Sequence, residues 1–310
     1  MTKLIWITGA TGFIGGAAAR RFATEGWRVI GFDRRRPEAN LPSAAFHVAP
    51  IEGWILEAAI GAHGKPDAVF HAAGTGTVGQ AQADPAKARH DTVETTAALV
   101  DTLSRVSPNT RVIYPSSAAV YGNSGAGPLA EGRTLNPASI YGRDKQDAEG
   151  ICLSSKLSVA IIRFFSVYGP GLRKQLPWEL AKKLIAGPGG VTLFGTGQET
   201  RDFLNIEDAV GLIRHLTTCE LAASLIVNGG TGVATTVANF ARLLADTLSK
   251  AIPIAFSGET KQGDPMHLLA DISRLTALPY QPQVSLKSGL AAYADWVKAE
   301  IAVEAARGDK

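Results

Sequence analysis

The segment at residues 139–149, SIYGRDKQDAE, places a tyrosine and a lysine four residues apart in a polar stretch. On a helix, residues four apart lie on the same face, so Tyr141 and Lys145 would stand side by side. An ammonium favours the charged form of a neighbouring phenol and lowers its pKa, which prepares a tyrosine to act as a general base. The ordinary alternative is an exposed tyrosine and lysine on a solvated helix, and the rest of the sequence must decide between the two.

A second group that can do chemistry is the glycine run in TGATGFIGG, which follows the first apolar segment. Its spacing is G-x-x-G-x-x-G. Gly9 allows a tight turn, Gly12 lets the backbone approach a pyrophosphate, and Gly15 lets a helix pack on a strand. The N-terminus of that helix would present its N–H groups to the phosphates. The run therefore predicts a dinucleotide site.

The choice of dinucleotide depends on the residues that end the second apolar segment. Asp33 can accept hydrogen bonds from both hydroxyls of an adenosine ribose, which favours NAD. Arg34 follows it and could bind a 2′-phosphate, so NADP stays open.

The elements that must position these groups alternate along the first half of the chain. Apolar runs predict strands, and longer amphipathic stretches between them predict helices near residues 12–25, 84–105 and 137–156. The runs are continuous rather than alternating, as in a parallel sheet that is buried on both faces. This pattern predicts an α/β fold with a doubly wound parallel sheet. The expected strands lie at residues 3–8, 28–33, 44–49, 67–74, 111–117 and 159–169.

The pattern changes after residue 169, where segments rich in glycine and proline separate shorter elements. We expect residues 1–168 to form a dinucleotide-binding Rossmann domain. Residues 169–310 would form a smaller, mainly substrate-binding α/β region, with some segments returning to the Rossmann core. The last segment predicts an amphipathic helix capped by Ser285. Its core-facing residues would be Leu286, Leu290, Tyr293, Val297 and Ile301.

Composition excludes several classes of protein. The 310 residues carry a net charge of +3, and the short cluster at residues 34–36 is not the basic stripe of a nucleic-acid surface. No apolar run reaches the ~18 residues that span a bilayer, and no signal-peptide pattern opens the chain. Two cysteines without a C-x-x-C suit a reducing compartment. No spacing of histidine, cysteine or carboxylate residues indicates a metal. We expect a soluble cytoplasmic protein.

Taken together, eight motifs in one order resemble the extended short-chain dehydrogenase/reductase family, in its nucleotide-sugar epimerase/dehydratase branch that includes UDP-glucose 4-epimerase. The resemblance covers nearly the whole chain. The motifs are TGATGFIGG, FHAAG, PSSAAVYG, SIYGRDK, RFFSVYGPG, LFGTGQETRDF, GDPMHLLADIS and VSLKSGL.

This resemblance implies the roles of the catalytic residues. Tyr141 and Lys145 are similar to the family's catalytic pair, and Ser117 is similar to its hydroxyl partner. Tyr141 would take the proton from a sugar hydroxyl as hydride leaves the same carbon for the nicotinamide. Lys145 would hold the nicotinamide ribose and lower the pKa of Tyr141, and Ser117 would hydrogen-bond the reacting oxygen.

The resemblance also implies contacts to cofactor and substrate, as well as a homodimer. Beside the glycines and Asp33, the cofactor contacts would be Phe13, Ile14, Ala72 and the catalytic pair. The nucleotide-sugar contacts would be Ser117, Ser166, Arg201 and Lys261.

Four positions depart from the family pattern. Pro50 stands where an aspartate often lies near the adenine, and Asp144 stands where a serine is usual. Thr92 and Ser166 each replace an asparagine.

Three functions fit these residues. The first is an NAD-dependent nucleotide-sugar 4-epimerase, with a UDP-hexose or a UDP-N-acetylhexosamine as substrate. The second is an NADPH- or NADH-dependent reductase of a nucleotide-linked 4-keto-6-deoxy sugar. The third is a dinucleotide-binding protein without turnover, against which the intact catalytic set argues. Dehydration is disfavoured because Ala118 and Ala119 stand where sugar dehydratases place acidic residues.

Overall fold

A seven-stranded parallel sheet organises the computed structural model, which describes residues 2–37, 41–123, 125, 127–187, 189–221, 223–259 and 265–308. The strand order is β10-β6-β5-β4-β1-β2-β3. This order reverses between β1 and β4, as in doubly wound sheets, so the predicted fold class is confirmed. The strands are β1 Leu4–Thr8, β2 Arg28–Asp33, β3 Ala45–Val48, β4 Ala68–His71, β5 Arg111–Ser117, β6 Ser158–Phe164 and β10 Leu225–Gly229.

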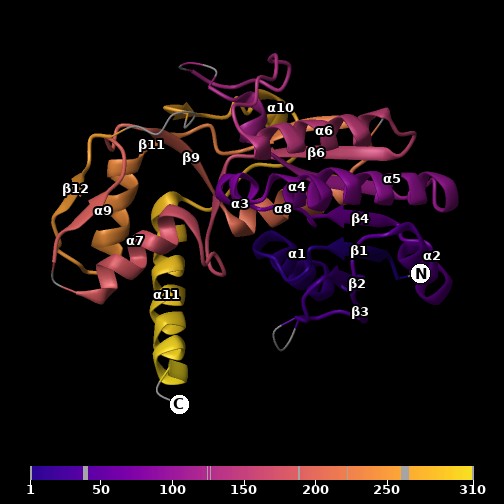
Figure 1. Cartoon of the computed structure of the whole chain (residues 1–310), viewed down its shortest axis with the longest axis horizontal. Helices are drawn as coiled ribbons and strands as arrows, with labels where there is room; N and C mark the ends of the chain where they lie inside the picture. The colour runs from indigo at the N-terminus through magenta and orange to yellow at the C-terminus, as the bar shows by residue number, and fades with distance from the viewer. Residues whose placement is uncertain are drawn as a thin grey trace.

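Helices cover both faces of this sheet (Figure 1). On one face, α1 (Phe13–Thr24) packs beside α8 (Ile206–Thr218). On the other face lie α2 (Gly53–His63), α5 (Thr95–Val106) and α6 (Ile140–Ser154). Because both faces are covered, all five residues of β1 are buried, which explains the continuous apolar runs in the sequence.

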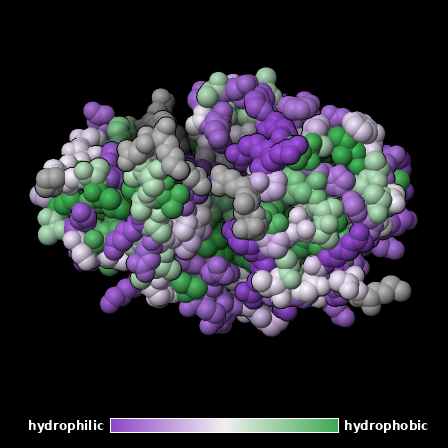
Figure 2. All heavy atoms as spheres, turned by 90° about the horizontal axis from the view of Figure 1, so that it is seen from below, coloured by the Kyte–Doolittle hydropathy of each residue, from purple (hydrophilic) through white to green (hydrophobic). Residues whose placement is uncertain are grey.

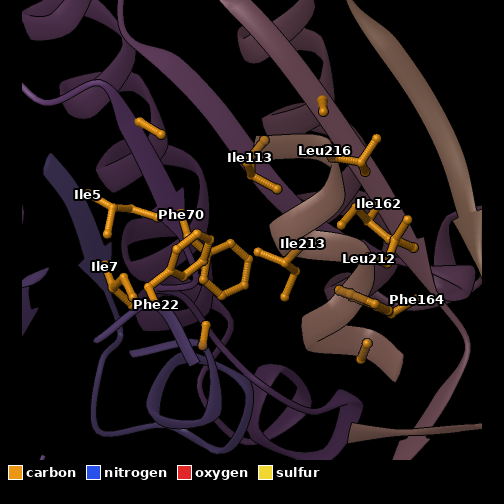
Figure 3. Packing of buried hydrophobic residues seen from close by; sticks show 14 of the residues in the cluster. Ile5, Ile7, Phe22, Phe70, Ile113, Ile162, Phe164, Leu212, Ile213 and Leu216 are labelled. Atoms are coloured by element: carbon orange, nitrogen blue, oxygen red, sulfur yellow. The ribbon is translucent and has the colours of Figure 1, made fainter. Parts of the chain in front are cut away.

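Alternate residues of each strand serve the two apolar cores. Figure 3 shows the core under α1 and α8, where Phe22 of α1 and Phe70 of β4 face Ile213 of α8. Ile5 and Ile7 of β1 belong to this core. The intervening residues of β1 point to the other core, under α2, α5 and α6.

The helical stretch expected at residues 84–105 is divided into shorter elements. α3 (Val78–Ala83) precedes α4 (Pro85–Arg89), and Asp84 caps α4 by accepting a hydrogen bond from the Lys87 N–H. A π-helical turn, η1 (His90–Glu94), then leads into α5. Such turns are rare and often occur at functional sites.

The single strand expected at residues 159–169 was a wrong prediction. β6 stays in the main sheet, whereas β7 (Ser166–Tyr168) leaves it to pair with β9 (Thr200–Asn205). The apolar run is continuous across this break, because β7 is also partly buried on its new partner.

The second half of the chain contributes to both parts of the molecule. β10 pairs with β6 in the main sheet, and α10 (Ser273–Thr276) packs on β10. Around β9 lie β11 (Ala234–Thr236) and β13 (His267–Leu268), and β8 (Val191–Leu193) pairs with β12 (Ile254–Phe256).

A third apolar cluster holds the C-terminal helices together, away from the main sheet in Figure 1. It joins α7 (Gln175–Ala186), α9 (Val237–Thr247) and α11 (Leu286–Gly308). The Ser285 hydroxyl accepts a hydrogen bond from the Ser288 N–H at 3.1 Å, so the predicted cap is confirmed. Three of the predicted core residues are fully buried, namely Leu290, Tyr293 and Val297, and Leu286 and Ile301 pack against them.

Figure 2 shows hydrophilic and hydrophobic residues interspersed on the face seen from below. Across the described ranges, no helix combines the length and apolar character that a membrane crossing requires.

Candidate active site

Tyr141 and Lys145 stand on one face of the first turns of α6. Ser139 begins the helix by accepting a hydrogen bond from the Gly142 N–H at 3.1 Å. The Lys145 Nζ lies 6.0 Å from the centre of the Tyr141 ring. Ser117 ends β5, and its hydroxyl lies close enough to the Tyr141 phenol to lower the pKa of that phenol. The structure therefore brings the three predicted catalytic residues together.

Close contact between α6 and the turn after β5 makes this arrangement possible. Ser117 caps the 3₁₀ turn η2 (Ala118–Tyr121) by accepting the Ala119 N–H at 3.2 Å. A Cβ on Gly142 would lie 2.5 Å from the Ala119 carbonyl oxygen. Only glycine fits there, so the residue after Tyr141 sets the distance between helix and turn.

Lys145 is buried and its ammonium is oriented by the end of β5. The Nζ donates a hydrogen bond to the Pro115 carbonyl at 2.9 Å and lies 4.9 Å from the centre of the Tyr114 ring. Burial lowers the pKa of Lys145 to about 8, against the opposing effect of the Glu149 carboxylate one helical turn later.

The structure does not show the predicted lowering of the Tyr141 pKa. Burial raises the pKa of Tyr141, and the nearby Ser117 hydroxyl lowers it by less. The physical reason is that the phenol is desolvated, while the Lys145 ammonium points to the Pro115 carbonyl rather than to the phenol oxygen.

The glycine loop packs closely against the loop after β4 and against the first turn of α1. Gly9 has φ +64, and a Cβ there would lie 2.6 Å from the carbonyl oxygen of Ala72, in the loop after β4. A Cβ on Gly15 would lie 2.2 Å from the Gly9 oxygen. Gly12 caps α1, whose first turn contains no acidic residue. These residues fit a dinucleotide pyrophosphate at the positive end of the helix.

Two apolar residues anchor the start of α1 in different cores. Phe13 packs against the C-terminal cluster around α7 and α11. Ile14 packs against the core beneath α1 and α8.

Asp33 lies at the end of β2, next to the glycine loop. Its carboxylate accepts hydrogen bonds from the Thr11 N–H at 3.1 Å and the Thr11 hydroxyl at 2.6 Å. It also accepts the Arg35 N–H at 3.0 Å. This position fits a carboxylate that meets the hydroxyls of an adenosine ribose.

The structure places the Arg34 guanidinium on a protein carboxylate. Arg34 makes two hydrogen bonds of 2.7 Å to Asp91 in η1, and Lys87 donates a third at 2.8 Å. Burial raises the pKa of Asp91, but these two cations outweigh burial and hold that pKa below its usual range. The cation beside Asp33 is instead Arg35, whose Nε lies 3.8 Å from the carboxylate. Sequence reasoning missed Asp91 because its pairing to Arg34 spans 57 residues.

A buried hydrogen-bond chain orders the loop after β4. The Thr8 hydroxyl accepts the Ala73 N–H at 3.0 Å and lies 2.8 Å from Nδ1 of His71. Nε2 of the same imidazole lies 3.1 Å from the Thr96 hydroxyl. Burial lowers the pKa of His71 to about 3, with a smaller effect of Lys145. Thr92, the departure in η1, accepts the Thr75 N–H at 3.1 Å.

A buried ion pair joins α6 to β6. Arg163 of β6 makes hydrogen bonds of 2.7 and 3.0 Å to Glu149 of α6. The same guanidinium donates to the Tyr121 hydroxyl and to the Glu131 carbonyl. Sequence reasoning missed this cluster. The remaining departure on α6, Asp144, is buried with Arg89 3.6 Å away, and burial raises the pKa of Asp144.

The predicted substrate residues lie on the strands that leave the main sheet. Ser166 on β7 is in register with Phe203 of β9, and Arg201 lies two residues earlier on β9. The Arg201 guanidinium donates to the Thr200 carbonyl at 2.9 Å. Lys261 falls outside the described residues. Asp202 is fully buried and binds the backbone of residues 231, 232 and 270.

Within the described part of the chain, no group of three histidine, cysteine or acidic side chains is placed to hold a metal ion.

Comparisons with known proteins agree with this architecture. The chain is 34% identical to an uncharacterized UDP-glucose epimerase of Bacillus subtilis over 184 residues, a match that spans 57% of each chain. It is 26% identical to a dTDP-L-rhamnose 4-epimerase of Burkholderia thailandensis over 96% of both chains. A solved UDP-glucuronic acid 4-epimerase of Bacillus cereus, in complex with UDP-glucuronic acid and NAD, superposes with a TM-score of 0.84. That pair is 26% identical, and the match covers 96% of this chain and 99% of the other.

The model of one protein family matches residues 5–224, which include the glycine loop, α6 and the crossover to β9. The chain belongs to the NAD dependent epimerase/dehydratase family.

Proposed function

We propose that this protein is an NAD-dependent nucleotide-sugar 4-epimerase that acts on a UDP-hexose through a 4-keto intermediate. The observation that carries the proposal is the meeting of Ser117, Tyr141 and Lys145 at the carboxyl end of β5, on the edge of the sheet where the glycine loop follows β1. Support comes from the family and from relatives that are named as UDP-sugar and dTDP-sugar 4-epimerases.

The glycine loop and Asp33 would hold NAD, with the pyrophosphate at the N-terminus of α1 and the adenosine ribose at the carboxylate. When bound, NAD supplies a hydride acceptor that later returns the hydride. Phe13, Ile14 and Ala72, which border the loop, would line this site.

Tyr141 would accept the proton of the sugar C4 hydroxyl and later give it back. Since burial raises its pKa in the free protein, the phenolate needs the positive charge of the oxidised nicotinamide and of Lys145. Ser117 would hydrogen-bond the same oxygen as its charge changes, and Lys145 would bind the nicotinamide ribose.

The residues after Ser117 favour return of the hydride over loss of water. Ala118 is buried, and neither Ala118 nor Ala119 can transfer a proton. A 4-keto sugar would therefore keep its C6 group and leave as either epimer.

We further propose that residues 1–168 mainly bind the dinucleotide and residues 169–310 mainly bind the nucleotide sugar. Ser166 and Arg201 would contact the substrate from neighbouring strands, and Lys261 would contact its phosphates. A homodimer in the cytoplasm is proposed from the family resemblance, and light scattering and cell fractionation test these two points.

The function is tested with the purified protein and UDP-glucose or UDP-galactose. We expect the denatured protein to release NAD. NMR should show that the two nucleotide sugars interconvert, and mass spectrometry should show no change of mass. A product lighter by one water would contradict the proposal. Consumption of added NADPH with a 4-keto-6-deoxy sugar, without epimer formation, would assign the protein as a reductase.

A further inference from the structure

A lysine from the second half of the chain reaches the loop between β4 and α3. Lys174 is the N-cap residue of α7. Its Nζ lies 2.8 Å from the position that a Cβ on Gly76 would occupy. The glycine therefore leaves space for an ammonium that comes from a residue almost one hundred positions later.

The backbone around Lys174 is held in place. The Tyr293 hydroxyl of α11 donates a hydrogen bond to the Leu172 carbonyl at 2.9 Å, and the Arg173 guanidinium pairs with Glu300 of the same helix. The next residue, Gln175, has φ +63, a left-handed conformation that is unfavourable for a residue with a side chain. Such a conformation persists only where the surroundings impose it, and it is concentrated at functional sites.

Among the residues that the structure describes, no anion lies beside the Lys174 ammonium. In the ranges that the structure describes, no hydrogen bond or ion pair joins it to another group. Burial lowers the pKa of Lys174, and the like charge of Arg35 lowers it further. A half-buried cation with a second cation nearby is unfavourable unless an anion compensates it.

The surrounding segments indicate which anion would do so. Gly171, just before Lys174, lies against Phe13 at the start of α1, since a Cβ there would be 3.4 Å from the Phe13 ring. Gly76 follows β4, and Gly9 follows β1 and packs on the Ala72 carbonyl. These loops flank the point where the strand order reverses, which is where doubly wound sheets bind the pyrophosphate of a dinucleotide.

We propose that Lys174 binds the pyrophosphate of the dinucleotide cofactor, as a ligand that the second half of the chain adds to a site built by the first half. The proposal rests on the proposed function, because it requires a dinucleotide in this crevice. The ammonium would donate a charge-assisted hydrogen bond to a phosphate oxygen. The N–H groups at the start of α1 would bind the same group from the other side.

The test measures binding to the full-length protein after removal of nucleotides, by equilibrium dialysis with radiolabelled NAD and with radiolabelled adenosine, which has no phosphate. Lys174→Met keeps the apolar stem and removes the charge, and Lys174→Arg restores the charge. Lys183→Ala is the matched control, because Lys183 is exposed on the last turn of the same helix. Circular dichroism and the melting temperature check that each variant is folded.

For Lys174→Met we expect the Kd of NAD to rise roughly 10- to 100-fold, the effect of one charge-assisted hydrogen bond. The Kd of adenosine should not change. The difference in NAD affinity between Lys174→Met and the wild type should become smaller as the salt concentration is raised, because added ions screen the attraction between Lys174 and the phosphates. Lys174→Arg should recover most of the affinity, and Lys183→Ala should bind as the wild type does.

Four outcomes would overturn this assignment while leaving the proposed function intact. Unchanged NAD affinity would mean that Lys174 does not meet the cofactor. Equal losses for NAD and adenosine would assign a structural role. Normal NAD affinity with weaker binding of UDP would place the lysine at the substrate diphosphate. A loss of affinity for NADP alone would place it at a 2′-phosphate. A wild-type protein that binds no dinucleotide would instead overturn the proposed function itself.

Discussion

The Tyr141 phenol loses its proton less readily in this protein than an exposed tyrosine does. Its pKa is raised by burial and only partly lowered by the Ser117 hydroxyl. Spacing alone identified Tyr141 and Lys145 as neighbours, because i and i+4 geometry is local. The direction in which the Tyr141 pKa shifts could not be predicted from spacing, because it depends on desolvation of the phenol and on where the Lys145 ammonium points.

Tyr141→Phe should lower turnover by roughly 10²- to 10⁴-fold, the contribution of general base catalysis. NAD binding should persist, because the ring still fills its site. Epimer formation followed by NMR gives the rate, and NAD release on denaturation gives the cofactor content.

Tyr280→Phe is the matched control, since the Tyr280 hydroxyl bonds the Asp208 carbonyl and makes no contact with the catalytic set. Tyr280→Phe should lower the melting temperature and leave the turnover rate close to that of the wild type. Near-normal turnover in Tyr141→Phe would show that this phenol has a structural role only.

The cofactor preference is also set at the residue scale. Asp33 should repel a 2′-phosphate and bind the ribose hydroxyls, so NAD should bind more tightly than NADP by ~1–3 kcal/mol. Asp33→Asn should raise the affinity for NADP relative to NAD at least about tenfold, because Arg35 lies beside this carboxylate.

Arg34→Ala serves as the comparison in the same dialysis measurement. It should leave the ratio of NAD to NADP affinity unchanged, because Arg34 is bound to Asp91. A large change in that ratio would instead make Arg34 the residue that selects the cofactor.

At the scale of elements, the strands and helices around the glycine loop could be predicted because they come from continuous apolar runs. The break between β6 and β7 could not, since the pairing of β7 with β9 joins segments far apart in the chain. The turn η1 was missed for a different reason. A local change of hydrogen-bond register leaves little trace in a sequence.

The contact between α6 and η2 gives a prediction at this scale. In Gly142→Ala, the added Cβ would lie 2.5 Å from the Ala119 oxygen, so the helix must move away from the turn. Both the melting temperature and kcat should fall, because Tyr141 would separate from Ser117.

Gly150→Ala changes the same residue type in the same helix, at an exposed position where the new Cβ would meet no group outside the helix's own backbone within 4 Å. It should stabilise the protein by up to about 1 kcal/mol and leave kcat unchanged. Equal behaviour of the two variants in thermal melts and assays would contradict this account of the contact.

The two halves of the whole molecule are interleaved. β10 pairs with β6 and α8 packs on α1, so the main sheet needs residues from beyond position 200. The core beneath α1 includes Leu212, Ile213 and Leu216 of α8 (Figure 3). Sequence patterns did not reveal β10, because LIVNG is a short run in a glycine-rich region.

A fragment of residues 1–168 should therefore not fold by itself, since it would expose the face that α8 covers. We expect circular dichroism without a cooperative melt, and aggregation on concentration, whereas the full chain melts cooperatively. As a control, residues 169–310 are added to the fragment as a separate chain. A fragment of residues 1–168 that by itself is stable and melts sharply would contradict the expectation.

Cys152 lies on α6, two turns beyond Lys145, where it is fully buried and burial raises the pKa of its thiol to about 12. Cys219, after α8, is only partly buried. A thiol-alkylating reagent should therefore modify Cys219 first and reach Cys152 only when α6 detaches from the sheet. The rate at which Cys152 is alkylated therefore measures how often the helix that carries Tyr141 opens away from the sheet.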